Sequence, residues 1–184
     1  GINNRGVALI DNKVVSHTLE GRWIVTNKDS GEIEQEVQLA DASVSEVITA
    51  APLGVKNSAI TGVSGAEYGI RGWLHSTNLA DGSKNWRTYT IPAPDEPGGD
   101  TWKQGPESHS KDAWMHGGGS TWVVGSYDPD LDVIYWGVGN PGPDWDNEYR
   151  PGDNLYSNSV LALDSDTGKI KWYFQYTPND PYDF

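Results

Sequence analysis

Two stretches of the chain share the pattern that decides its fold: WLHSTNLADGSKNW, residues 73–86, and VLALDSDTGKIKW, residues 160–172. Each has an apolar strand, a turn that contains Asp and Gly, and a Trp four residues after that Gly. A third stretch, RWIVTNKDSGEIEQ at 22–35, repeats the turn but has Gln35 where the others have Trp. Such self-similarity indicates a repeated structural unit.

The repeat predicts an all-β chain built from four-stranded modules, in which the Trp after each turn docks on the next module. A circular propeller is the natural closure of such a series, and a β-sandwich with unrelated hairpins is the alternative. No stretch shows a 3.6-residue apolar period over about 11 residues, so long helices are not expected. The apolar and turn residues predict short strands over 7–10, 14–18, 23–26, 32–39, 52–55, 59–64, 73–78, 86–91, 122–124, 133–138, 160–164 and 170–176, with a helical turn over 112–115.

The composition limits the classes of function. The chain has 184 residues, enough for one sizeable core, and its 22 Gly, 11 Pro, 9 Trp and 9 Tyr are typical of short strands joined by tight turns. The formal net charge of -13 argues against binding to nucleic acid or to an anionic membrane surface. No apolar run of about 18 residues is present, so no membrane span is expected. Because no initiator Met is present, we expect an internal piece or a processed form.

The segment at 117–143, GGGSTWVVGSYDPDLDVIYWGVGNPGP, is where we expect a binding site. Its three opening glycines, at 117–119, allow the backbone to approach something flat or bulky. Trp122 follows, and a second glycine turn at 137–139 leads into Asn140. A segment that presents a few side chains at turns indicates a site rather than a core.

In order and spacing, the motifs of the chain resemble those of the pyrroloquinoline quinone (PQQ) dependent alcohol dehydrogenases of the methanol and ethanol dehydrogenase type. The likeness extends over essentially the whole chain. The motifs that carry it are SGAEYGIRG (64–72), GGGSTW (117–122), SYDP (126–129), GVGNP (137–141), RPGDNLY (150–156) and ALDSDTGKIKW (162–172). The resemblance implies an eight-bladed propeller with Trp-docking repeats. Residues 1–184 would then be a single partial domain, truncated at both ends, that supplies roughly half of the ring.

The resemblance also implies which residues bind the cofactor. Trp122 matches the indole that stacks on one face of the quinone, because a planar cofactor needs an aromatic floor, and the glycines at 117–119 would leave room for it. Arg5 matches an arginine that hydrogen-bonds the quinone oxygens. The hydroxyl donors around the carboxylates of the cofactor, together with the backbone that helps them, match Thr49, Ser64, Gly65, Ala66 and Ser120. From the residues alone, Trp122 is also compatible with a core position, and Thr49 and Ser64 with strand edges.

The metal ligands and the catalytic base follow from the same resemblance. Glu67 and Asn140 match the family's metal ligands, and an all-oxygen set of carboxylate and amide suits Ca²⁺ or a similarly hard ion. Asn140 could also be a turn residue before Pro141. Asp183 matches the base that accepts the hydroxyl proton of the alcohol. In many members a second Asp two positions after the base completes a lanthanide site. Since that position would be 185, both Ca²⁺ and a lanthanide remain open.

The function implied by the resemblance is oxidation of a small alcohol to an aldehyde by hydride transfer to metal-activated PQQ. Electrons would pass to a cytochrome c-type acceptor in the periplasm. The family's adjacent Cys pair, which covers the other cofactor face, would fall just before Gly1. A PQQ-dependent sugar or polyol dehydrogenase is the nearest alternative, and a non-catalytic propeller scaffold is the alternative of another class. Because a partial ring exposes unpaired strand edges, we expect residues 1–184 alone neither to fold stably nor to turn over.

Overall fold

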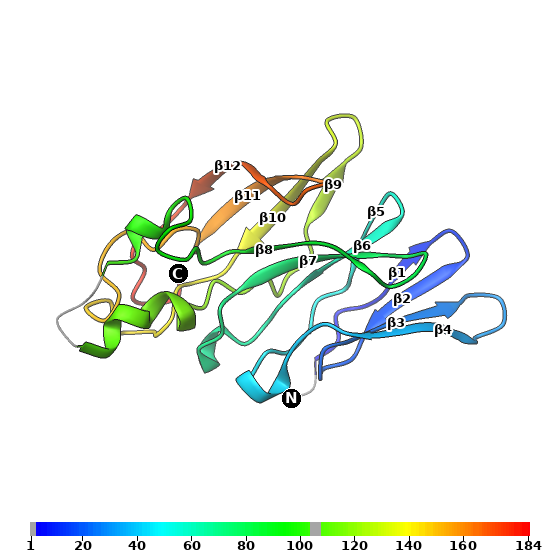
Figure 1. Cartoon of the computed structure of the whole chain (residues 1–184), viewed down its shortest axis with the longest axis horizontal. Coiled ribbons are helices and arrows are strands. Elements are labelled where there is room, and N and C mark those ends of the chain that lie inside the picture. Colours follow the sequence, from blue (N-terminus) through cyan, green and yellow to red (C-terminus); the bar gives the residue numbers. More distant parts are fainter. Residues whose placement is uncertain (1–2, 104–107) are drawn as a thin grey trace.

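The computed structural model describes residues 3–103 and 108–184, without the side chains of 108–110, and contains three four-stranded sheets set side by side (Figure 1). The first sheet consists of β1 (Ala8–Ile10), β2 (Lys13–His17), β3 (Arg22–Asn27) and β4 (Ile33–Gln38). The second consists of β5 (Leu53–Val55), β6 (Ser58–Gly62), β7 (Trp73–Asn78) and β8 (Lys84–Tyr89). The third consists of β9 (Ser126–Asp128), β10 (Val133–Val138), β11 (Ser159–Asp164) and β12 (Ile170–Gln175).

Each sheet is an antiparallel meander whose strands lie in chain order. Strand β5 contacts both β1 and β9, so the first strands of the three sheets lie next to one another while the last strands fan outward (Figure 1). This is the arrangement of blades around a propeller axis. The all-β prediction is confirmed, and the described part of the chain holds three blades, where half of an eight-bladed ring would hold four.

The core consists of two apolar layers, one between each pair of neighbouring sheets. Trp23 of β3 and Trp73 of β7 are both fully buried in the layer between the first and second sheets. The layer between the second and third sheets contains Leu74, Trp86 and Trp136. Face-to-face packing of aromatic and branched side chains therefore fixes the angle between adjacent blades.

The docking tryptophan predicted from the repeat is present between the second and third sheets. The indole Nε1 of Trp86 donates a hydrogen bond of 3.0 Å to the carbonyl oxygen of Ser165, in the turn between β11 and β12. A Cβ at Gly168 in this turn would lie 2.4 Å from the Trp86 ring, and Gly168 has a φ of 69°. Both the close contact and the left-handed backbone require glycine at this turn position.

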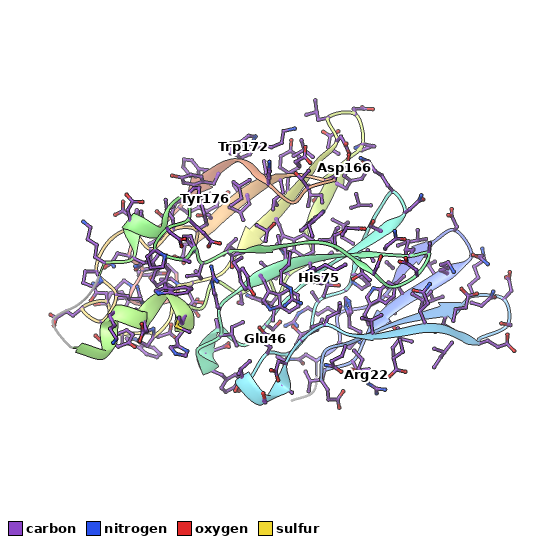
Figure 2. All side chains as sticks on the ribbon, viewed as in Figure 1. Arg22, Glu46, His75, Asp166, Trp172 and Tyr176 are labelled. Carbon is purple, nitrogen blue, oxygen red and sulfur yellow. The ribbon has the colours of Figure 1, made fainter. Side chains whose placement is uncertain are left out.

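Gln35 makes the equivalent contact between the first and second sheets. Its Nε2 donates a hydrogen bond of 2.8 Å to the carbonyl oxygen of Leu79. Leu79 and Ser165 each precede their turn glycine by three residues, so the two bonds occupy the same place in successive blades. At the matching position of β12, Trp172 is 50% exposed at the outer edge of the third sheet (Figure 2), because no further sheet follows among the described residues.

One predicted strand is wrong. The segment at 122–124 has no strand pairing, and β9 begins instead at Ser126. The backbone N–H of Thr121 donates to Val63 O at 2.8 Å, and its Oγ1 donates to Trp73 O at 2.7 Å. These bonds attach the segment to the second sheet, and the next three side chains are left 43 to 49% exposed.

The helical segments are short 3₁₀ turns in the connections. They are η1 (Ala42–Val44), η2 (Ala66–Tyr68), η3 (Gly99–Thr101) and η4 (Ser108–His116), the last of which contains the helical turn expected over 112–115. Over 3–103 and 108–184, no helix has the length and apolar character that crossing a membrane requires.

Candidate cofactor and metal site

One cavity of about 410 Å³ brings together most of the residues assigned to the cofactor. Five connections line it: the segment before β1, the β2–β3, β4–β5 and β6–β7 connections, and the segment before β9. The predicted residues among its lining are Arg5, Thr49, Ser64, Gly65, Glu67, Ser120 and Trp122. Ala66 is the exception, since it is buried in η2 and does not line the cavity.

Trp122 and Arg5 form one wall of this cavity. The indole of Trp122 is 43% exposed, so it is not a core tryptophan. The guanidinium carbon of Arg5 lies over the ring at 4.8 Å from its centroid, within the range of a cation–π contact. The backbone N–H of Arg5 donates to Thr49 O at 3.1 Å, which holds the arginine at the cavity. The site therefore contains an aromatic ring with a cation lying over its face.

The two hydroxyls of the β4–β5 and β6–β7 connections face each other. Thr49 Oγ1 lies 2.8 Å from Ser64 Oγ. The two connections are also joined by a pair of backbone hydrogen bonds between Val47 and Ser64, at 3.1 and 2.8 Å. The pairing agrees with the strand-edge interpretation of these hydroxyls as well as with a place in a binding cavity.

A second cavity, of about 400 Å³, shares Ser120 and Trp122 with the first. Its lining includes Asn140, at the end of the turn after β10, and Asp183, near the end of the chain. The two cavities thus adjoin across Trp122. Glu67 lines the first cavity, and Asn140 and Asp183 line the second. Every predicted site residue except Ala66 lies on one of the two cavities.

The glycine run at 117–119 packs against protein and leaves no open space for a cofactor. A Cβ at Gly117 would lie 2.6 Å from the Trp102 ring, and one at Gly119 would lie 2.5 Å from Ile91. At Gly118, where φ is 71°, a Cβ would lie 2.9 Å from a backbone nitrogen. The interpretation that these glycines leave room for a flat cofactor is therefore wrong. They let the segment pack closely against neighbouring side chains and backbone, and Gly119 N donates to Asn140 O at 2.9 Å.

Asp183 lies in a tight turn organised by a neighbouring carboxylate. Asp180, which is 1% exposed, accepts hydrogen bonds from the backbone N–H groups of Tyr182 and Phe184 at 2.9 and 2.8 Å. Asp183 projects from this turn with a φ of 59°. Partial burial raises the pKa of its carboxyl above the usual value, and the negative charges of Asp144, Asp180 and Glu67 raise it further.

The donor set at the metal position consists of oxygen atoms. The predicted metal ligands are the carboxylate of Glu67 and the amide carbonyl of Asn140, which line the two adjoining cavities. In the described part of the chain, no group of three or more His, Cys, Asp and Glu side chains is arranged to hold a metal ion. Hard oxygen donors with one neutral amide among them fit Ca²⁺ or a lanthanide ion, and they do not fit zinc.

Residues 10–184 match the PQQ family described as the β-propeller domain of glucose, ethanol and alcohol dehydrogenases. The chain belongs to this family.

Three relatives illustrate the likeness, at 35 to 40% identity. The quinoprotein alcohol dehydrogenase PedH of Pseudomonas putida is 40% identical over 194 residues, which cover 98% of this chain and 32% of that protein. A lanthanide-dependent methanol dehydrogenase of Methylorubrum extorquens is 38% identical over 192 residues, which cover 98% of this chain and 32% of that protein. The solved structure of a europium-containing methanol dehydrogenase superposes with a TM-score of 0.90 at 35% identity, over 99% of this chain and 34% of that one. The chain thus spans about a third of the length of these relatives.

Two residues that the sequence analysis missed make hydrogen bonds around Asn140 and the turn that contains Asp183. Asp144 accepts a hydrogen bond of 2.7 Å from Asn140 Nδ2. Arg150 is fully buried and donates to the carbonyl oxygens of Pro143 and Asp180 at 3.0 and 2.7 Å. Asp144 gave no signal in the sequence because an Asp among prolines and glycines is typical of a turn.

Proposed function

We propose that the chain forms the cofactor-binding part of a quinoprotein that oxidises a small alcohol to an aldehyde. The observation that carries the proposal is the convergence of Arg5, Glu67 and Trp122, from three distant connections, on one cavity. A non-catalytic propeller would have no reason to bring an aromatic face, a cation and a carboxylate together there. The adjoining cavity adds Asn140 and Asp183.

The residues around the two cavities fit PQQ and a hard metal ion. Trp122 would provide the stacking face, Arg5 would donate to the quinone oxygens, and the hydroxyls of Thr49, Ser64 and Ser120 would hold the carboxylates. Gly65 and Ala66 would contribute backbone, and Glu67 and Asn140 would bind Ca²⁺ or a lanthanide. Because the Arg5 guanidinium lies over the Trp122 ring, it would have to move to the edge of the ring before a planar group could stack on that face.

Asp183 would carry the proton chemistry. When bound, metal-activated PQQ supplies the hydride acceptor for the alcohol carbon. The carboxylate of Asp183 would accept the hydroxyl proton of the alcohol as a general base. Asp180 would keep this carboxylate in place through the turn at the end of the chain.

We further propose that the three blades are part of a larger ring. The support is the exposure of Trp172. It occupies the same position in the third blade as Trp86 does in the second, where Trp86 docks on the following blade. A cytochrome c-type electron acceptor and a periplasmic location follow from the family resemblance and belong to the same proposal.

The test uses the full-length protein that contains this chain. It is reconstituted with PQQ and either Ca²⁺ or a light lanthanide, and reduction of an artificial electron acceptor is measured with primary alcohols and with glucose. We expect turnover of alcohols with at least one ion. Asp183→Asn should lower turnover by about 10²- to 10⁴-fold, as loss of a general base does, while Glu32→Gln, at an exposed turn, serves as the matched control.

Two outcomes would contradict this assignment. Turnover of glucose or polyols without turnover of simple alcohols would move the substrate class to sugars. Failure to bind PQQ with either ion would remove the enzyme proposal and leave the propeller as a scaffold.

A further inference from the structure

The carboxamide of Asn140 makes a hydrogen bond that fixes its orientation. Asn140 Nδ2 donates to Asp144 Oδ1 at 2.7 Å, whereas its distance to the carbonyl oxygen of Pro141 is a long 3.4 Å. An ionised carboxylate can only accept hydrogen bonds, so it must face the amino end of the amide. The carbonyl end of Asn140 is therefore directed away from Asp144.

This orientation matters because only one end of an amide binds a hard cation. Ca²⁺ and lanthanide ions take oxygen ligands, and the amino group of an amide has no lone pair to offer them. An Asn side chain that turned over by half a rotation would present NH₂ to the metal and would repel it. A fixed acceptor on the amino side prevents that rotation.

Asp144 is itself held in place by a buried cation. Arg150 donates from Nε and from one terminal nitrogen to the carbonyl oxygen of Pro143, the residue before Asp144, at 3.2 and 3.0 Å. Arg150 has no exposed surface, so its guanidinium is shielded from bulk water. The Asp144 side chain is half-buried between this clamp and Asn140.

We propose that Asp144 is a positioning residue for the metal site, which holds the Asn140 carboxamide with its carbonyl oxygen toward the ion. The inference rests on the proposed function, because it assigns a role toward the metal that Glu67 and Asn140 would bind. Groups that orient metal ligands typically change metal affinity by about 10- to 100-fold when they are removed. Asp144 contacts the ligand and does not take part in the reaction.

Two variants of equal charge separate the hydrogen bond from the electrostatic effect. Asp144→Ala and Asp144→Asn both remove one negative charge, but only the asparagine keeps an oxygen that can accept from Asn140 Nδ2. Glu148→Ala is the matched control, because it removes an exposed carboxylate from the same loop. Melting of the metal-free proteins shows whether any variant has lost its fold.

The measurement is calorimetric titration of Ca²⁺, and separately of La³⁺, into the full-length protein loaded with PQQ and stripped of metal. We expect Asp144→Ala to bind either ion about 10-fold or more weakly than Asp144→Asn. We also expect Asp144→Asn to stay close to Glu148→Ala, and the metal-free variants to melt alike. Equal affinities of Asp144→Ala and Asp144→Asn would overturn the positioning role while leaving the proposed function intact. Absence of metal binding by the unsubstituted protein would overturn both.

Discussion

Arg150 donates a hydrogen bond of 2.7 Å to the carbonyl oxygen of Asp180, thirty residues further along the chain. The same guanidinium binds the carbonyl oxygen of Pro143, so it joins the loop after Asn140 to the turn that presents Asp183. Burial lowers the pKa of this guanidinium, and the charges of nearby Asp residues oppose that effect. The relative position of a proposed metal ligand and the proposed base thus depends on one buried side chain.

Replacement of Arg150 should affect both stability and metal binding. Arg150→Met removes the donor from the buried carbonyl oxygen of Asp180 and from that of Pro143, and each hydrogen bond to a charged group contributes about 1.5 to 3 kcal/mol. Arg150→Lys keeps the charge but cannot reproduce the planar fork. We expect both variants to melt at lower temperature and to bind Ca²⁺ more weakly. A lysine variant that melts and binds metal as the unsubstituted protein does would show that the fork has no such role.

The contact between the second and third blades gives a separate prediction. Trp86→Phe keeps an aromatic ring in the layer but removes the donor to Ser165 O, and an unsatisfied buried carbonyl costs about 1 to 3 kcal/mol. Gly168→Ala should be at least as damaging, since its Cβ would lie 2.4 Å from the Trp86 ring. Thermal unfolding of the full-length protein checks both. Gly137→Ala is the control, because a Cβ there has no neighbour within 4 Å.

Loss of the aromatic face should weaken cofactor binding. Trp122→Ala removes the surface on which the quinone would stack, and aromatic stacking is worth about 0.5 to 1.5 kcal/mol beyond burial, or up to about tenfold in affinity. Trp122→Phe should retain most of the affinity. Trp145→Ala, which removes a tryptophan that is 75% exposed, is the matched control. Fluorescence titration with PQQ measures the three affinities. Unchanged binding in Trp122→Ala would exclude stacking on this indole.

His17 predicts a loss of stability in mild acid. Its ring nitrogens lie 3.1 Å from Ala50 O and 2.9 Å from Thr61 Oγ1, and burial lowers its pKa from 6.5 to about 4. Because the unfolded chain takes up the proton more readily, the contribution of His17 is complete above about pH 6.5 and is lost as the pH falls toward 4. We expect His17→Gln to melt with a shallower dependence on pH over this window. If the melting temperatures of the two proteins fell equally steeply with pH, the assignment would be contradicted.

The repeat predicted most of the fold, and the family motifs singled out residues that the structure gathers on two adjoining cavities. Turn glycines such as Gly168 have a local cause, a left-handed φ, and local causes can be read from sequence. Gln35 could be recognised as a departure from the repeat, but its bond to Leu79 O appears only in the structure. The same limit applies to the strand expected over 122–124, where the hydrogen bonds of Thr121 to the second sheet override an apolar pattern.

Arg150, which the sequence analysis missed, acts through a contact that is distant in the chain. Arg150 belongs to the RPGDNLY motif, yet nothing in that motif indicates that its side chain reaches Asp180. The glycines at 117–119 were correctly singled out as sites of close approach, and only the structure identified the partner as protein. Sequence patterns indicate which residues are constrained, whereas the packing decides what constrains them.

The most direct test of the central claim is a crystal structure of the full-length protein soaked with PQQ and a lanthanide, with anomalous scattering used to locate the ion. We predict one anomalous peak bounded by oxygen atoms of Glu67 and Asn140, with the quinone stacked on Trp122. A peak elsewhere, or PQQ bound away from Trp122, would show that the two cavities are not the cofactor and metal site.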